Sequence, residues 1–200
     1  MVSIDEAKDF LFNCCKVPSN RLDSAGDLPF DSDSWRVGKY NGPPRYLKKF
    51  IPPKGWTAVG LKVYNLYDGG DNTWLGTSNS EGEWFTGYHG VKTSLAIHNI
   101  CMEGFRKGPG QGHKDCDNIN SINKNIYQKC GEGVYLAQDI NQAAYYTAPI
   151  KYNNKNYKVV FMCRINPKAV KISNMGIGKD FYITSGHYDE VRPYRILFKS

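Results

Sequence analysis

Hydrophobic and polar residues alternate along several short segments of the chain, the pattern of half-buried β-strands. Residues 158–164 (Lys-Val-Val-Phe-Met-Cys-Arg) give the clearest predicted strand. Further strands are predicted at residues 56–67, 169–172, 182–183 and 191–198. A run of short strands separated by turns indicates a mostly antiparallel sheet.

Three segments show helical rather than alternating spacing. Apolar residues recur at helical intervals within residues 1–16 and again within residues 94–104, where Gly104 ends the helix. A third helix is predicted after Asp139, a natural N-cap, and runs through Tyr146. Few helices combined with many strands predict an α+β fold.

The sequence predicts one domain with an N-terminal extension. Residues 56–200 hold most of the predicted strands, whereas residues 1–55 hold the first helix and a segment with Pro43-Pro44 and Pro52-Pro53. Paired prolines favour extended backbone. We therefore predict that residues 1–55 form a helix and a proline-containing arm packed on the domain formed by residues 56–200.

Composition narrows the class of protein. An apolar content of 40%, with 14% aromatic residues, is that of a globular protein. The net charge of +7 favours phosphate-bearing or other acidic partners, but the Lys and Arg residues form no block, so nucleic acid is not specifically indicated. No apolar run reaches the length of a membrane span, and the first residues do not resemble a secretory signal. The six cysteines are expected to be reduced, so we predict an intracellular protein, cytoplasmic or nuclear. We also expect it to be a monomer.

Candidate chemistry comes from motifs in a fixed order. Tyr88-His89-Gly90 is followed by Gly131-Glu-Gly-Val-Tyr-Leu-Ala137, then by the strand at 158–164, then by Tyr188-Asp189-Glu190. In this order the motifs resemble the catalytic domain of the poly(ADP-ribose) polymerase-like ADP-ribosyltransferases, over residues 84–198. The resemblance implies a mostly antiparallel split β-sandwich with few helices.

The same resemblance implies a His-Tyr-Glu triad made of His89, Tyr135 and Glu190, and NAD as the substrate. His89 would hydrogen-bond the adenosine-side ribose, and the backbone of Gly90 would meet the nicotinamide carboxamide. Tyr135 would lie against the nicotinamide ring, Tyr146 would be a second stacking residue, and Glu190 would hold the 2′-hydroxyl of the nicotinamide ribose. Tyr145 is the alternative to Tyr146 as the stacking residue.

These roles agree with the chemistry of glycosidic cleavage. Loss of nicotinamide leaves positive charge on the ribose, as in sugar hydrolysis. A fixed carboxylate stabilises that charge more than it stabilises the ground state, so no metal is needed. Two positions depart from the family pattern: Val91 stands where Thr or Ser is common, and Ala143 stands where a serine often meets the nicotinamide amide.

The expected function is that of an enzyme, a mono-ADP-ribosyltransferase. It would transfer ADP-ribose from NAD to a macromolecular acceptor and release nicotinamide, and a protein acceptor is favoured over nucleic acid. Two alternatives stay open. Water would be the acceptor in an NAD glycohydrolase, and a catalytically silent module would only bind NAD or ADP-ribose.

Two other motifs carry weaker signals. His113-x-x-Cys116, with Cys101 and Cys130 nearby, invites a zinc interpretation, but it contains no paired Cys-x-x-Cys, so ordinary thiols are favoured. The glycine-rich run 108–112 lacks the Lys-Ser/Thr ending of a phosphate-binding loop. We expect it to belong to a long loop, residues 106–131, beside the NAD site.

Overall fold

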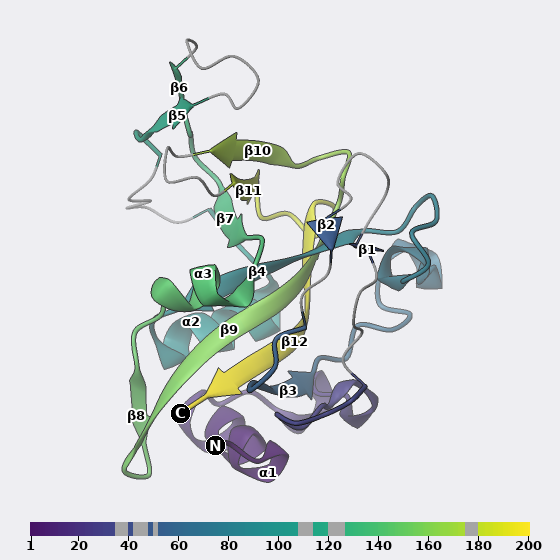
Figure 1. Ribbon diagram of the computed structural model, residues 1–200. Coiled ribbons are helices and arrows are strands. Elements are labelled where there is room, and N and C mark those ends of the chain that lie inside the picture. Colours follow the sequence, from purple (N-terminus) through teal and green to yellow (C-terminus); the bar gives the residue numbers. More distant parts are fainter. Residues whose placement is uncertain (35–39, 42–47, 50–51, 108–113, 120–126, 175–179) are drawn as a thin grey trace.

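An eight-stranded antiparallel sheet organises the chain (Figure 1). The computed structural model describes residues 1–34, 40–41, 48–49, 52–107, 114–119, 127–174 and 180–200. The strand order is β10-β11-β7-β4-β9-β12-β3, and β8 pairs with β9 beside this path. The strands are β3 (Thr57–Gly60), β4 (Phe85–Val91), β7 (Val134–Ala137), β8 (Ile150–Tyr152), β9 (Lys155–Ile165), β10 (Lys171–Asn174), β11 (Asp180–Thr184) and β12 (Val191–Lys199). The predicted α+β class with a mostly antiparallel sheet is confirmed.

Helices cover both faces of the sheet. In Figure 1, α3 (Ile140–Tyr145) lies in front of the sheet and α2 (Ser94–Glu103) lies behind it. The strand β9 is apolar on both faces, because Val160 and Met162 pack with α3 while the alternate residues Val159 and Phe161 pack in the core on the other side. Burial on both faces explains why residues 159–163 form a continuous apolar run rather than an alternating one.

The sheet is almost divided between β4 and β7. Along β9, β4 is paired over its full length, from Phe85 with Ile165 to Val91 with Val159. Along β7, which the structure describes throughout, its recorded pairing is Tyr88 with Ala137 alone. The sheet therefore consists of two well-paired halves, β10-β11-β7 and β4-β9-β12-β3 with β8, joined at a narrow point.

The N-terminal residues pack on this sheet. The helix α1 (Ile4–Asp9) continues into a π-helical turn (Phe10–Cys14), so the predicted helix exists but is irregular in its second half. Phe10 is fully buried and its ring meets the rings of Tyr157 and Phe198. Bridges join Leu22 to Leu61 and Leu28 to Ala58. Residues 1–34 thus share the core of the sheet, while the Pro43-Pro44 part of the predicted arm lies outside the described residues.

Several predicted boundaries need correction. The strand predicted over residues 56–67 ends at Gly60, and 3-10 turns follow at Asp68–Gly70 and Thr73–Leu75. The segment 106–131, predicted as loop, contains a small two-stranded sheet of β5 (Asp117–Ile119) and β6 (Tyr127–Lys129), and β1 (Tyr40–Asn41) pairs with β2 (Lys48–Lys49). Short 3-10 turns also occur at Ser19–Arg21 and Ser24–Gly26.

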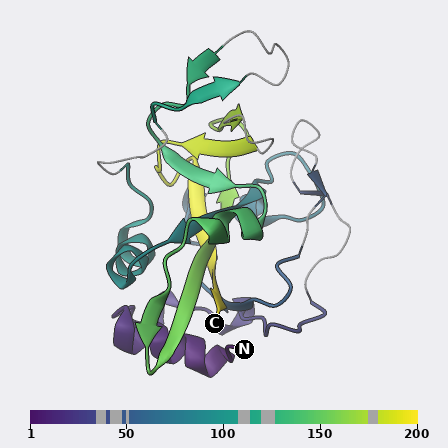
Figure 2. The same cartoon turned by 60° about the vertical axis from the view of Figure 1, so that its left-hand side comes forward.

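The hairpin of β8 and β9 was not predicted, although its turn is marked in the sequence. Asn153 and Asn154 both have positive φ, 46° and 60°. Two successive residues of this kind form the tight turn whose twist matches antiparallel strands. This hairpin and the small β5-β6 sheet lie at opposite ends of the molecule (Figure 2).

A buried arginine holds the start of β12. Arg192 is 1% exposed, and its guanidinium donates to the two carboxylate oxygens of Asp68 at 2.7 and 2.8 Å. Its Nε donates to the Tyr188 carbonyl at 2.8 Å. The rings of Tyr67, Trp74 and Trp84 surround the guanidinium carbon at 4.2–4.8 Å. The planar fork of arginine fits this set of acceptors and ring faces, which an ammonium group cannot match.

We predict that Arg192→Lys lowers the free energy of unfolding by about 1–3 kcal/mol, because it keeps the charge but loses the bidentate hydrogen bonds. Urea unfolding measures this change. Arg106→Lys is the matched control, since Arg106 forms an exposed pair with Glu103 and should change stability by less than about 0.5 kcal/mol. Equal effects of the two substitutions would contradict the assigned role of Arg192.

Candidate functional site

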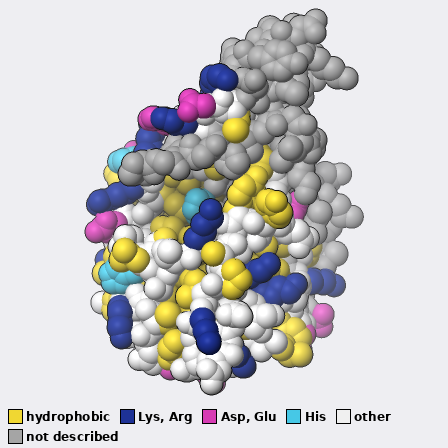
Figure 3. All heavy atoms as spheres, turned by 90° about the vertical axis from the view of Figure 1, so that its left-hand side faces the viewer, with side chains coloured by type: hydrophobic (Ala, Val, Ile, Leu, Met, Phe, Trp, Pro, Cys, Tyr) yellow, Lys and Arg dark blue, Asp and Glu magenta, His cyan; other side chains and the backbone are white. Residues whose placement is uncertain are grey.

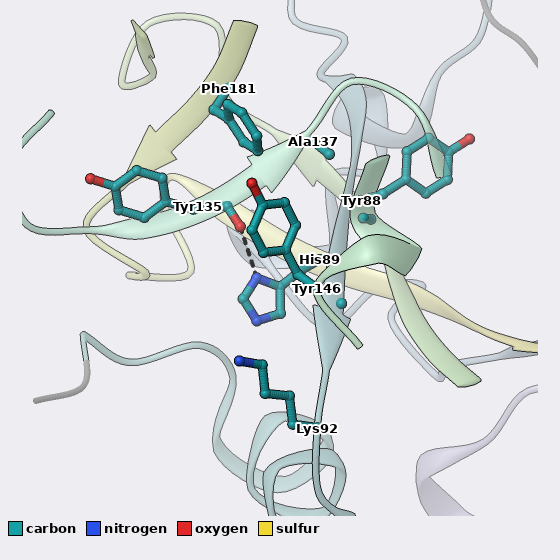
Figure 4. Close-up of a pocket in the computed structure, with 9 residues that line it drawn as sticks. Tyr88, His89, Lys92, Tyr135, Ala137, Tyr146 and Phe181 are labelled. Atoms are coloured by element: carbon teal, nitrogen blue, oxygen red, sulfur yellow. Dashed lines mark hydrogen bonds between the residues drawn. The ribbon is translucent and has the colours of Figure 1, made fainter. Parts of the chain in front are cut away.

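A cavity of about 150 Å³ opens where the two halves of the sheet separate (Figure 4). It lies among β4, β7, β11 and α3. Its walls include Tyr88, His89, Gly90, Tyr135, Tyr146 and Phe181. Four of the five residues expected in the site from the sequence therefore lie around one cavity, although they are separated by up to 57 positions in the chain.

His89 bridges the two halves at this point. Its Nδ1 lies 2.8 Å from the carbonyl oxygen of Tyr135. A carbonyl only accepts, so Nδ1 carries the proton and donates it, which leaves the lone pair on Nε2. Burial lowers the pKa of His89 below its usual value, and the hydrogen bond to Tyr135 offsets that effect in part. The imidazole is therefore neutral at pH 7 and offers Nε2 as a hydrogen-bond acceptor.

The two tyrosines predicted to stack lie differently. The ring of Tyr135 points away from His89 in Figure 4, and its hydroxyl donates to the Gly131 carbonyl at 2.5 Å. Burial raises the pKa of Tyr135 to about 12, so its hydroxyl stays protonated. Tyr146 lines the cavity and meets Phe181 edge to face at 5.9 Å. Tyr145 is 84% exposed, so of the two candidates Tyr146 is the one placed at the cavity.

The helix α3 closes one side of the cavity against Gly90. Asp139 caps this helix by accepting from the Gln142 amide at 2.9 Å, as predicted from the sequence. A Cβ at position 90 would lie 2.3 Å from the carbonyl oxygen of Ala143. Glycine at position 90 is therefore required by the packing of α3, a reason that the sequence did not reveal. Ala143 is buried and also lines the cavity.

Glu190 comes from a different element, the turn that precedes β12. It ends the turn between β11 and β12, and its carboxylate accepts a hydrogen bond from the backbone amide of Ser185. Its own amide donates to the His187 carbonyl at 2.9 Å. Glu190 is not among the residues that line the cavity, so the structure brings His89 and Tyr135 together but leaves Glu190 outside their cavity.

Two further cavity residues were not found from the sequence. Phe181, in β11, reads as an ordinary core residue, and Lys92, just after β4, reads as a surface lysine. The Lys92 side chain is exposed and points toward His89 in Figure 4, where it places a positive charge at the cavity. Asp180 precedes Phe181 and is the first residue of β11, the strand paired with the Tyr135 strand. Only the spatial order of the strands reveals these neighbours.

The sequence matches no protein-family model and no curated protein at a significant level.

The described residues show neither a metal-binding cluster nor a helix that could cross a membrane. Within the described ranges, no three His, Cys, Asp or Glu side chains converge on a position that could hold a metal ion. His113, part of the possible zinc motif, lies outside those ranges, and the six cysteines are free thiols. None of the described helices has the length and apolar character needed to cross a membrane. Lys and Arg side chains are spread over the face seen in Figure 3 and form no single block there.

We predict that the His89 imidazole carries its proton on Nδ1 and titrates with a pKa below 6.5, because burial disfavours the charged ring. Nitrogen-15 NMR of labelled histidine measures both properties. Since the folded pKa lies below the unfolded one, the stabilisation from His89 is present above pH 6.5 and is lost as the pH falls below it. His89→Gln, which does not titrate, should flatten this part of the stability profile. A protonated His89 at pH 7 would refute the tautomer assignment.

We also predict that Gly90→Ala loosens α3, because the new Cβ must displace the Ala143 carbonyl. Overpacking of this kind costs roughly 1–3 kcal/mol. Hydrogen exchange at the amides of residues 143–146 should become faster. Gly69→Ala is the control, since a Cβ there meets nothing within 4 Å and strains only a backbone with φ of 67°. Unchanged exchange in α3 for Gly90→Ala would show that the helix is not held by this contact.

Proposed function

We propose that the chain is an NAD-dependent mono-ADP-ribosyltransferase that transfers ADP-ribose to a macromolecular acceptor and releases nicotinamide. The observation that carries the proposal is the single cavity at which His89, Gly90, Tyr135 and Tyr146 meet. They come from motifs separated by up to 57 positions in the chain, and their convergence on one cavity is what a shared site requires.

The near-division of the sheet supports the finer fold proposal, a split β-sandwich of the ADP-ribosyltransferase type. The two halves are each joined by extended ladders, while β4 and β7 share the pair Tyr88 and Ala137. A fold split at this point has its cavity between the halves. His89 and Tyr135 come from the two strands that face each other across the division.

The cavity walls suit the parts of NAD. The free lone pair on Nε2 of His89 can accept a hydrogen bond from a ribose hydroxyl, which is a donor. The aromatic rings of Tyr146 and Phe181 suit a flat nicotinamide ring. Lys92 supplies a positive charge for the pyrophosphate. At about 150 Å³ the cavity holds only one end of NAD, so the remainder would extend past its rim.

The reaction also needs a carboxylate beside the nicotinamide ribose. Breaking the bond between nicotinamide and ribose sends the electron pair to nicotinamide and leaves positive charge on the sugar. We propose Glu190 for this role, with the 2′-hydroxyl of the ribose as its partner. Because Glu190 stands outside the cavity, the ribose would have to lie between the cavity and the β11-β12 turn.

The second candidate is a catalytically silent module that binds NAD or ADP-ribose. It is favoured by one observation, the position of Glu190 outside the cavity that His89 and Tyr135 line. The NAD glycohydrolase alternative uses the same residues with water as the acceptor, so the products distinguish it from the transferase.

We predict that the purified protein consumes NAD labelled in its adenosine part and transfers the label to itself or to an added protein. Glu190→Gln should keep NAD affinity but lower turnover by about 100-fold or more, the loss typical when a group that stabilises transition-state charge is removed. Glu81→Gln is the matched control, since Glu81 is exposed and does not line the cavity.

The outcomes of this assay distinguish between the candidate functions. Unchanged turnover in Glu190→Gln would reject the catalytic role of Glu190. Free ADP-ribose without labelled macromolecule would identify a glycohydrolase. NAD binding without consumption would identify the silent module, and neither binding nor consumption by the folded protein would reject the proposal.

A further inference from the structure

A second and larger cavity, of about 510 Å³, lies at the outer side of α3. Ala143 and Tyr146 of the α3 region face the first cavity, whereas Asn141, Ala144 and Tyr145 face this one. Its floor comes from the sheet, where Trp56, Lys158 and Lys199 contribute to the lining. None of its lining residues belongs to the His89 cavity, so the second cavity needs its own explanation.

Two lysines face each other across the floor of this cavity. Lys158 of β9 is the direct cross-strand partner of Lys199 of β12. Both lie on the α3 face of the sheet, since each is two residues from a member of the α3 core cluster, Val160 or Leu197. Like charges placed directly opposite each other in an antiparallel pair are destabilising. The sheet thus tolerates a repulsive pair at the point where the cavity opens.

The charge of this pair is not neutralised within the described part of the protein. No described carboxylate forms an ion pair with Lys158 or Lys199, although Lys155, on the same strand, pairs with Glu6 at 2.8 Å. Lys199 lies 5.8 Å from the centre of the Trp56 ring. Two ammonium groups close together are suited to bind a dianion.

Aromatic and amide groups complete the lining. Tyr145 of α3 is 84% exposed, an unusual position for a large ring, and its side chain borders the cavity. Asn141 and Asn156 add amides that both donate and accept hydrogen bonds. An exposed ring next to a pair of cations is the arrangement that binds a base by stacking and a phosphate by charge.

We propose that this cavity binds a nucleoside monophosphate, either free or as the phosphorylated end of an oligonucleotide. The phosphate lies between the ammonium groups of Lys158 and Lys199, and the base stacks on Tyr145. The net charge of +7 favours the approach of such a ligand, while the local pair provides the specific contact. The proposal does not depend on transfer chemistry at His89.

Calorimetric titration at low salt tests the site with AMP, adenosine, the dinucleotide pApA and its unphosphorylated form ApA. The double variant Lys158→Ser/Lys199→Ser should bind AMP at least about tenfold more weakly, because two charge-assisted contacts are lost. The matched control Lys62→Ser/Lys168→Ser removes the same charge at exposed positions that do not line the cavity and should stay within about twofold. Tyr145→Ala should weaken AMP binding but leave binding of inorganic phosphate unchanged.

The unfolding temperature gives a second readout. The double variant at 158 and 199 should unfold at the same temperature as the parent or higher, because it removes a repulsive pair. Tighter binding of pApA than of AMP assigns the phosphate to an oligonucleotide end, and equal binding assigns it to a free nucleotide. If the control variant weakened AMP binding equally, the effect would come from net charge alone, and the proposal would be overturned. Phosphate-dependent binding lost in Lys92→Ala but kept in the double variant would place the ligand in the His89 cavity and overturn it as well.

Discussion

The hydrogen bond between His89 and the Tyr135 carbonyl joins β4 to β7 at the point where the backbone pairing of these two strands ends. After the pair Tyr88 and Ala137, an unbroken antiparallel ladder would bring Gly90 opposite Tyr135. The strands separate instead, and the carbonyl of Tyr135 needs another donor. The imidazole of His89 supplies it. That one bond fixes the tautomer of the ring, orients its free nitrogen and sets the distance between the two halves of the sheet.

The separation is maintained by α3. Its carbonyl at Ala143 fills the space where any side chain at position 90 would lie, so glycine is needed for the helix to come this close. The helix in turn brings Tyr146 to the cavity and Tyr145 to the outer surface. Two cavities of different character therefore follow from one short helix. One is bordered by a neutral histidine and aromatic rings, and the other by an exposed ring and two ammonium groups that form no ion pair with the carboxylates of the described residues.

The elements that the sequence predicts well are those whose signals are local. The apolar run in β9, the capping aspartate Asp139 and the glycine after α2 are each readable from a few neighbouring residues. The strand order is not readable in this way, because β7 lies between β11 and β4, strands that are distant in the chain. For the same reason Phe181 and Lys92 were missed, and the sequence could not show that Glu190 does not line the cavity of His89. The order of motifs led to His89, Gly90, Tyr135 and Tyr146, while the packing that makes position 90 a glycine could be seen only in three dimensions.

The position of Glu190 is determined by rigid neighbours rather than by the cavity. Arg192, two residues later, is held by Asp68 and three aromatic rings, and its Nε binds the Tyr188 carbonyl on the other side of Glu190. The Ser185 amide binds the carboxylate itself. A carboxylate fixed in this way can act only on the part of a ligand that reaches it. A nicotinamide ring held within the cavity of about 150 Å³ does not by itself reach Glu190, which does not line that cavity. Catalysis by Glu190 therefore requires the ribose to span the gap between the split in the sheet and the β11-β12 turn.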